Sequence, residues 1–82
     1  MESTYIKFLQ RYISDNNDIS INNIDIDADM FENDYIDSIG IFTLFVEIEE
    51  QFDIPISLNR LEDIDILTIR NLSKIIENET SN

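Results

Sequence analysis

The chain has 82 residues, which is enough for one small domain. It contains no cysteine and no histidine, which excludes disulfide bonds, thiolate zinc sites and catalytic triads that use an imidazole as general base. Eighteen acidic residues outnumber five basic ones, for a formal net charge of -13, so nucleic acid and anionic membranes would repel the chain whereas a basic partner would attract it.

Hydrophobic residues make up 43% of the chain, which indicates a folded core rather than an acidic disordered segment. No stretch approaches the roughly 20 apolar residues that a membrane span needs, and the first residues lack the pattern of a secretory signal. We therefore expect a folded, cytoplasmic protein without membrane insertion.

The first predicted helix covers residues 4–14 and ends where a run of turn-forming Asp and Asn residues begins. Residues 15–36 have no helical period, and we predict a long loop there with one short turn near Met30 and Phe31. Alternating isoleucines in the same stretch also fit short strands. The apolar stripe of the first helix consists of Tyr5, Ile6, Leu9, Tyr12 and Ile13.

The second predicted helix runs from about Ser38 to Gln51. Asp37 and Ser38 are both good N-cap residues, and Asp53 and Pro55 are expected to end the helix.

Two more helices are predicted in the remainder of the chain. A short third helix covers residues 58–63, and the last helix begins after its cap, Thr68, and frays from Glu77 onward. These elements predict an all-α domain of four helices with a long first loop. The buried stripe of the last helix is Ile69, Leu72, Ile75 and Ile76.

The second predicted helix carries two apolar stripes, because each residue turns the helix by about 100°. The stripe assigned to the core comprises Ile41, Leu44, Phe45, Ile48 and Phe52. The second stripe has two alternative interpretations. Either the helix is buried on both sides, or the stripe is a docking face for a partner with basic residues around a shallow groove. This second stripe and the carboxylates beside it include Ile39, Phe42, Val46, Glu49 and Glu50.

Ser38, at the start of the same helix, also has two interpretations. A serine at this position is usually only an N-cap. A phosphate ester there would be favoured by the helix dipole and by the free N–H groups of the first turn. Helix position alone does not decide between them.

The run from Tyr35 to Gly40, Tyr-Ile-Asp-Ser-Ile-Gly, leads into a helix that ends in acidic residues and Phe52. This arrangement closely resembles the acyl carrier protein family, with Ile39 in the position of the leucine in that family's Asp-Ser-Leu motif. The resemblance covers about residues 4–78 and includes the small size and the acidity.

The resemblance implies one carrier domain over residues 1–82, folded as an acyl-carrier-protein-like four-helix bundle with a short third helix. It implies that a separate magnesium-dependent phosphopantetheinyl transferase (holo-ACP synthase) esterifies Ser38 with 4'-phosphopantetheine from coenzyme A. The arm's thiol then holds acyl groups as thioesters. Further implied partners are acyl- or aminoacyl-loading and transferring enzymes with basic docking surfaces. The partner-contacting positions that match are Asp37, Ile39, Phe42, Val46, Glu49 and Glu50.

We expect a monomer without catalytic activity of its own, since the cofactor would supply the thiol and partner enzymes the catalysis. Gly40 stands where fatty-acid carriers more often have an acidic residue, and Ser-X-Gly is similar to D-alanyl and other specialised carriers. Fatty-acid, polyketide or related acyl cargo is therefore expected, with an aminoacyl or D-alanyl carrier as the alternative. Asp34 and Tyr35 replace the glycine often found before the motif, and Asp tolerates left-handed geometry.

Asp25, Asp27 and Asp29 have the spacing of a calcium loop. Met30 and Ile36 occupy the positions that require Gly and Glu, so no metal site is predicted. An acidic adaptor protein without a cofactor is the alternative from another functional class. An enzyme is disfavoured because the sequence offers no activated nucleophile.

Overall fold

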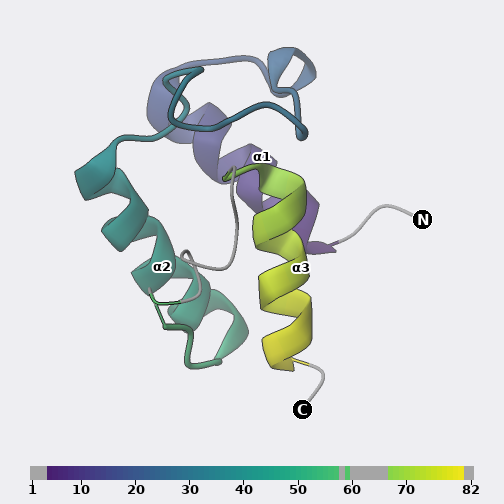
Figure 1. The fold of residues 1–82 in the computed structure, drawn as a ribbon. Helices are drawn as coiled ribbons and strands as arrows, with labels where there is room; N and C mark the ends of the chain where they lie inside the picture. The colour runs from purple at the N-terminus through teal and green to yellow at the C-terminus, as the bar shows by residue number, and fades with distance from the viewer. Residues whose placement is uncertain (1–3, 58, 60–66, 81–82) are drawn as a thin grey trace.

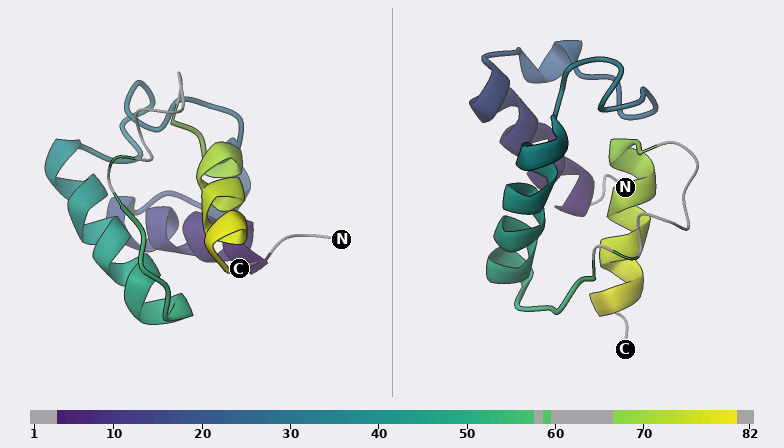
Figure 2. Two further views of the ribbon diagram at one scale, coloured as in Figure 1. Left: turned by 60° about the horizontal axis from the view of Figure 1, so that its bottom comes forward. Right: turned by 60° about the vertical axis from the view of Figure 1, so that its left-hand side comes forward.

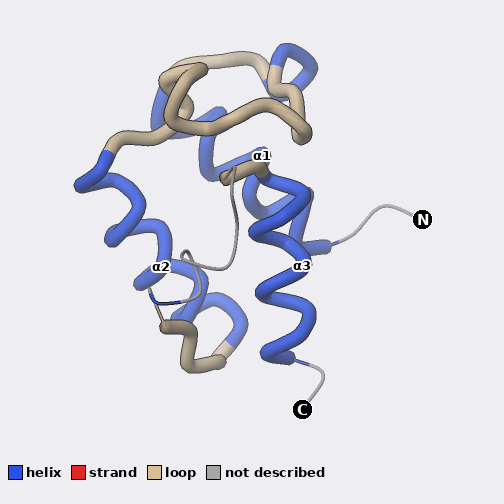
Figure 3. The backbone as a smooth tube through the Cα atoms, in the orientation of Figure 1, coloured by secondary structure: helices blue, strands red, loops and turns tan. Residues whose placement is uncertain are grey.

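The computed structural model describes residues 4–57, 59 and 67–80 of the chain. These residues form the α-helices α1 (Thr4–Asn17), α2 (Ser38–Phe52) and α3 (Ile69–Thr80), and a 3-10 helix, η1 (Ile21–Asn23) (Figure 1). None of them is in a strand (Figure 3), which confirms the all-α prediction and argues against the strand alternative for the long loop. The predicted helix at residues 58–63 lies, except for Asn59, outside the described residues, so the count of four helices stays a prediction.

The first helix continues past its predicted end at residue 14 and reaches Asn17. The Nδ2 of Asn16 donates to the Tyr12 carbonyl at 2.8 Å, and the Nδ2 of Asn17 donates to the Ile13 carbonyl at 3.1 Å. The prediction of a break at residue 15 is wrong because these amides bond one helical turn back instead of forming a turn of their own. Asp18, with a φ of 58°, ends the helix in the left-handed conformation.

Helices α2 and α3 lie on either side of α1, and the loop of residues 18–37 covers one end of the three helices (Figures 1 and 2). The predicted core stripe of α2 is buried, apart from the half-buried Phe52. Each fully buried aliphatic side chain stabilises the fold by about 1.5–3 kcal/mol relative to exposure. The fully buried side chains of the three helices are Leu9, Ile13, Leu44, Ile48, Ile69, Leu72 and Ile76.

Backbone hydrogen bonds join the long loop to the start of α3. Met30 N donates to the Leu67 carbonyl at 2.8 Å, and Arg70 N donates to the Ile26 carbonyl at 3.0 Å. The Met30 side chain is fully buried. Arg70 also pairs with Asp27 through two hydrogen bonds, of 2.6 and 3.2 Å, but both side chains are exposed and such pairs contribute little. Burial of Met30 and the backbone bonds therefore hold the loop in place.

The third helix begins directly after Thr68, whose Oγ1 accepts a 3.0 Å hydrogen bond from Asn71 N. This confirms the predicted cap, and all four residues of the predicted stripe are buried. The predicted fraying from Glu77 is wrong, because α3 extends to Thr80, whose Oγ1 lies 2.9 Å from the Tyr5 hydroxyl of α1. Among the described helices, none has the length and apolar character needed to cross a bilayer.

Candidate functional site

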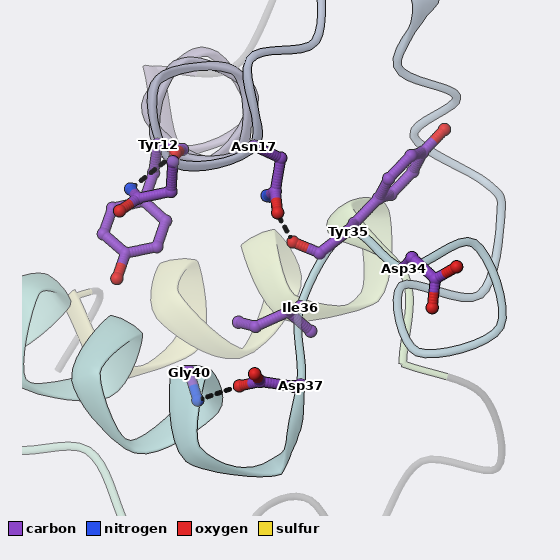
Figure 4. A pocket seen from close by; sticks show the side chains of 8 residues that line it. Tyr12, Asn17, Asp34, Tyr35, Ile36, Asp37 and Gly40 are labelled. Atoms are coloured by element: carbon purple, nitrogen blue, oxygen red, sulfur yellow. Dashed lines mark hydrogen bonds between the residues drawn. The ribbon is translucent and has the colours of Figure 1, made fainter.

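Ser38 is the first residue of α2 and is exposed. Asp37 is the N-cap: its backbone is extended, with φ −110° and ψ −179°, and its Oδ1 accepts a 2.5 Å hydrogen bond from Gly40 N (Figure 4). The Asp37 carbonyl also accepts from Ile41 N at 3.1 Å. Of the two predicted capping residues, Asp37 therefore performs the role, and the Ser38 hydroxyl is not used as the cap.

The segment that leads to Ser38 is fixed by hydrogen bonds from several directions. Tyr35 N and Ile36 N both donate to the Met30 carbonyl, at 2.8 and 3.3 Å. The Nδ2 of Asn17 donates to the Tyr35 carbonyl at 2.7 Å (Figure 4), and the Tyr35 hydroxyl accepts from Asp25 N at 3.1 Å. The start of α2 is thus tied both to the end of α1 and to the long loop.

Asp34 ends the turn that precedes this segment. Its φ is 58°, and its N–H donates to the Phe31 carbonyl at 3.2 Å. This backbone conformation favours glycine, but Asp adopts it more readily than most residues. The expectation that Asp34 can replace the glycine often found before the motif is confirmed.

A cavity of about 360 Å³ lies beside the first turn of α2 (Figure 4). Partial burial and, to a smaller extent, the Glu47 carboxylate raise the pKa of the Tyr12 phenol above its ordinary value, so the phenol stays neutral at physiological pH. The cavity is lined by Tyr12, Asn16, Asn17, Asp34, Tyr35, Ile36, Asp37 and Gly40.

The second apolar stripe of α2 is exposed. The exposed fraction is 78% for Ile39, 54% for Phe42 and 53% for Val46. Burial of α2 on both sides is therefore the wrong explanation. Glu49 and Glu50 are also exposed, but Glu49 has a structural contact as well, because its Oε1 accepts a 3.3 Å hydrogen bond from Ile56 N.

Sequence reasoning placed the acidic surface on α2, but the long loop is more acidic. Residues 18–37 contain seven acidic residues and no basic residue, and this loop covers the end of the bundle where α2 begins (Figure 1). A count of charges by segment would have found this signal. The seven residues are Asp18, Asp25, Asp27, Asp29, Glu32, Asp34 and Asp37.

The carboxylates that resemble a calcium loop are occupied by local contacts. Asp25 Oδ1 accepts from Asp27 N at 2.9 Å, and Asp29 Oδ1 accepts from Phe31 N at 2.9 Å. Asp27 pairs with Arg70. Within the part of the chain that the structure describes, no group of three or more side chains is arranged to hold a metal ion.

Comparison with known proteins gave a match to a protein-family model. A family model described as the phosphopantetheine attachment site matches residues 7–76. The matched range includes all of α2 and most of α1 and α3. The comparisons with curated proteins and with solved structures gave no match.

Proposed function

This chain belongs to the phosphopantetheine attachment site family and is a phosphopantetheine carrier, and we propose that Ser38 is the residue that holds the prosthetic group. Members of the family bear 4'-phosphopantetheine in covalent linkage. Family membership does not name the attachment residue in this chain. The proposal for Ser38 rests on its sequence motif and on its position in the fold.

The observation that carries the proposal is an exposed serine in the first turn of α2, whose cap is made by the preceding residue. Because Asp37 caps the helix, esterification of Ser38 leaves the capping hydrogen bond in place. The positive end of the helix dipole favours an anionic phosphodiester at this position. The residues present therefore fit the group.

Other serines in the described residues fit less well. Ser57 is exposed, but its Oγ accepts a 3.2 Å hydrogen bond from Asn59 N. The Ser73 hydroxyl is buried and donates to the Arg70 carbonyl at 2.7 Å. The Ser14 hydroxyl donates to the Ile19 carbonyl at 2.5 Å. Ser20 is exposed and precedes a helix, but η1 has only three residues. Ser20 is therefore the matched control for Ser38.

When bound, the prosthetic group supplies a terminal thiol that holds cargo as a thioester. The chain's own contribution is to present Ser38 at a fixed helix end and to offer a docking surface to partner enzymes. We place this surface on the predicted partner-contacting residues of α2 together with Asp37. Its apolar side chains are exposed and its acidic ones complement a basic partner. The surface comprises Asp37, Ile39, Phe42, Val46, Glu49 and Glu50.

We further propose that the cargo is an acyl group of a fatty-acid, polyketide or related pathway, with an aminoacyl or D-alanyl group as the alternative. Gly40 and Thr43 favour the alternative, because fatty-acid carriers more often have an acidic residue at each of these two positions. Measurement of the intact mass distinguishes an acyl cargo from an aminoacyl or D-alanyl cargo. The modified protein is incubated with an acyltransferase and its acyl donor or, separately, with an amino-acid-activating ligase, the amino acid and ATP. The mass increase identifies the cargo class.

The attachment residue is tested by intact mass before and after incubation with coenzyme A, magnesium and a broad-specificity phosphopantetheinyl transferase. The wild-type protein and the Ser20→Ala variant should each gain one phosphopantetheine, and Ser38→Ala should gain none while it remains folded. Modification of Ser38→Ala would refute the assignment. A folded wild-type protein that stays unmodified, while a known carrier is modified in parallel, would favour the acidic adaptor.

A further inference from the structure

We propose that α1 carries a second docking surface, which binds an acidic amphipathic helix of a partner protein through Lys7 and Arg11, here called the basic pair. This surface is opposite in charge to the one placed on α2, whose acidic residues suit a basic partner. Binding to α1 requires no prosthetic group on Ser38.

The basic pair stands apart from the charge of the surrounding chain. Lys7 and Arg11 are the only basic residues among residues 1–59, which contain thirteen acidic residues. Because they are four residues apart on α1, they lie on the same face of the helix with Cβ atoms about 5–6 Å apart, and both are exposed. Asp15 is the one acidic residue of α1. Among the described helices, α1 alone therefore has a net positive charge.

A second pair of basic residues with the same spacing, on α3, is used within the fold. The hydrogen bond from Arg70 lowers the pKa of Asp27, and the charges of Arg70 and Lys74 also lower it. Arg11, by contrast, forms no ion pair with any residue that the structure describes. Its charge is therefore available to a carboxylate of another molecule.

Two surface cavities flank the basic pair, and both are lined by its two side chains. The cavity towards α2 has a volume of about 430 Å³ and includes the half-buried rings of Phe8 and Tyr12, whose centroids lie 6.4 Å apart. The other cavity, of about 420 Å³, lies towards η1, because the chain turns back along α1 after this helix (Figure 1). Ile21 lines it and is exposed. Basic and apolar groups thus alternate across the surface, as at protein interfaces in which pockets accept apolar side chains.

Charge and shape together specify the occupant. Two carboxylates four residues apart on a partner helix have the same spacing as the basic pair, and apolar side chains beside them fit the cavities. Nucleic acid and anionic membranes also present negative groups, but a chain with a net charge of -13 repels such extended polyanions. A short acidic helix avoids most of this repulsion, because charges beyond about 10 Å are largely screened at about 0.1 M salt.

The α1 surface and the α2 surface are separate. The residues that line the two cavities include none of the residues of the proposed α2 docking surface. A partner bound to α1 therefore leaves the acidic surface of α2 open to an enzyme with a basic docking surface. We infer that one protein holds the carrier through α1 while another acts on its cargo.

The test measures the binding of a fluorescent synthetic helical peptide to the unmodified full-length chain by anisotropy at about 0.1 M salt. The peptide has Glu pairs four residues apart with Leu on the same face, and its control has Gln in place of every Glu. The protein variants are Lys7→Gln with Arg11→Gln and, as the matched control, Arg70→Gln with Lys74→Gln. The control pair has the same spacing, is also exposed and undergoes the same change of charge. Circular dichroism establishes that each variant is folded.

We expect the wild-type protein to bind the Glu peptide more tightly than the Gln peptide. Removal of the basic pair of α1 should weaken binding about tenfold, the change expected from the loss of two exposed ion pairs, whereas the α3 variant should match the wild type. Affinity should be highest at intermediate salt, since the net charge repels the peptide at lower salt and the ion pairs are screened at higher salt. Amide chemical-shift changes should fall on α1 and η1.

Three results would overturn the inference: no saturable binding of the Glu peptide, equal affinity for the two peptides, or an equal loss of affinity in the α1 and α3 variants. Shift changes confined to α2 or α3 would also exclude the proposed surface. Because the unmodified chain is used, these outcomes are independent of whether Ser38 is the attachment residue.

Discussion

Replacing Asn17 with alanine should weaken the connection between the end of α1 and the start of the functional helix. The Asn17 Nδ2 donates to the Tyr35 carbonyl at 2.7 Å and to the Ile13 carbonyl at 3.1 Å. Tyr35 is buried and this hydrogen bond is partly buried, so water replaces the lost partner of the carbonyl only in part. An unsatisfied buried group costs about 1–3 kcal/mol, and we take about 1.5 kcal/mol as the expected loss because the site is only partly buried.

Asn16→Ala is the matched control. Asn16 is the preceding residue of the same helix, and its Nδ2 bonds only back to the Tyr12 carbonyl, at 2.8 Å, in an exposed position. Both substitutions gain the same helix propensity, which therefore cancels in the comparison. Urea denaturation should show Asn17→Ala less stable than Asn16→Ala by about 1 kcal/mol, equivalent to a melting temperature lower by about 4–8 °C for a domain of this size. Equal stabilities would refute the proposed tie between α1 and the segment before Ser38.

Two other perturbations test the surface and its charges. Phe42→Ala should change the free energy of unfolding by less than about 0.5 kcal/mol, because the side chain is 54% exposed, yet it should raise the KM of partner enzymes. Phe31→Ala, 41% exposed on the loop, is the control, and an equal rise in KM would remove Phe42 from the docking surface. The hydrogen bond from Arg70 lowers the pKa of Asp27, so this pair contributes stability above the ordinary Asp pKa, and the contribution is lost as pH falls through the lowered value. Arg70→Gln should therefore be slightly less stable than the wild type at neutral pH and low salt but equal to it in strong acid, and a difference that persists in acid would exclude the ion pair as its cause.

Much of this protein follows from local sequence patterns. The helical period predicted the apolar stripes of α2 and α3, and Thr68 was correctly predicted as the cap at which α3 begins. Asp37 and Ser38 marked the start of α2, because short polar side chains at a helix end accept hydrogen bonds from free N–H groups. The family resemblance rested on this segment together with the helix that follows it, the small size of the chain and its acidity, all of which can be read from the sequence.

Tertiary structure decided the features that depend on contacts between distant residues. A helical wheel shows that α2 has two apolar sides, but only the packed fold shows that Ile39 and Phe42 are left exposed. Asn17 looks like a helix breaker in the sequence, yet it remains helical while its side chain reaches the Tyr35 carbonyl, 18 residues away. Local propensity fixes where a helix can form, whereas burial and the direction of a side chain are properties of its neighbours in space.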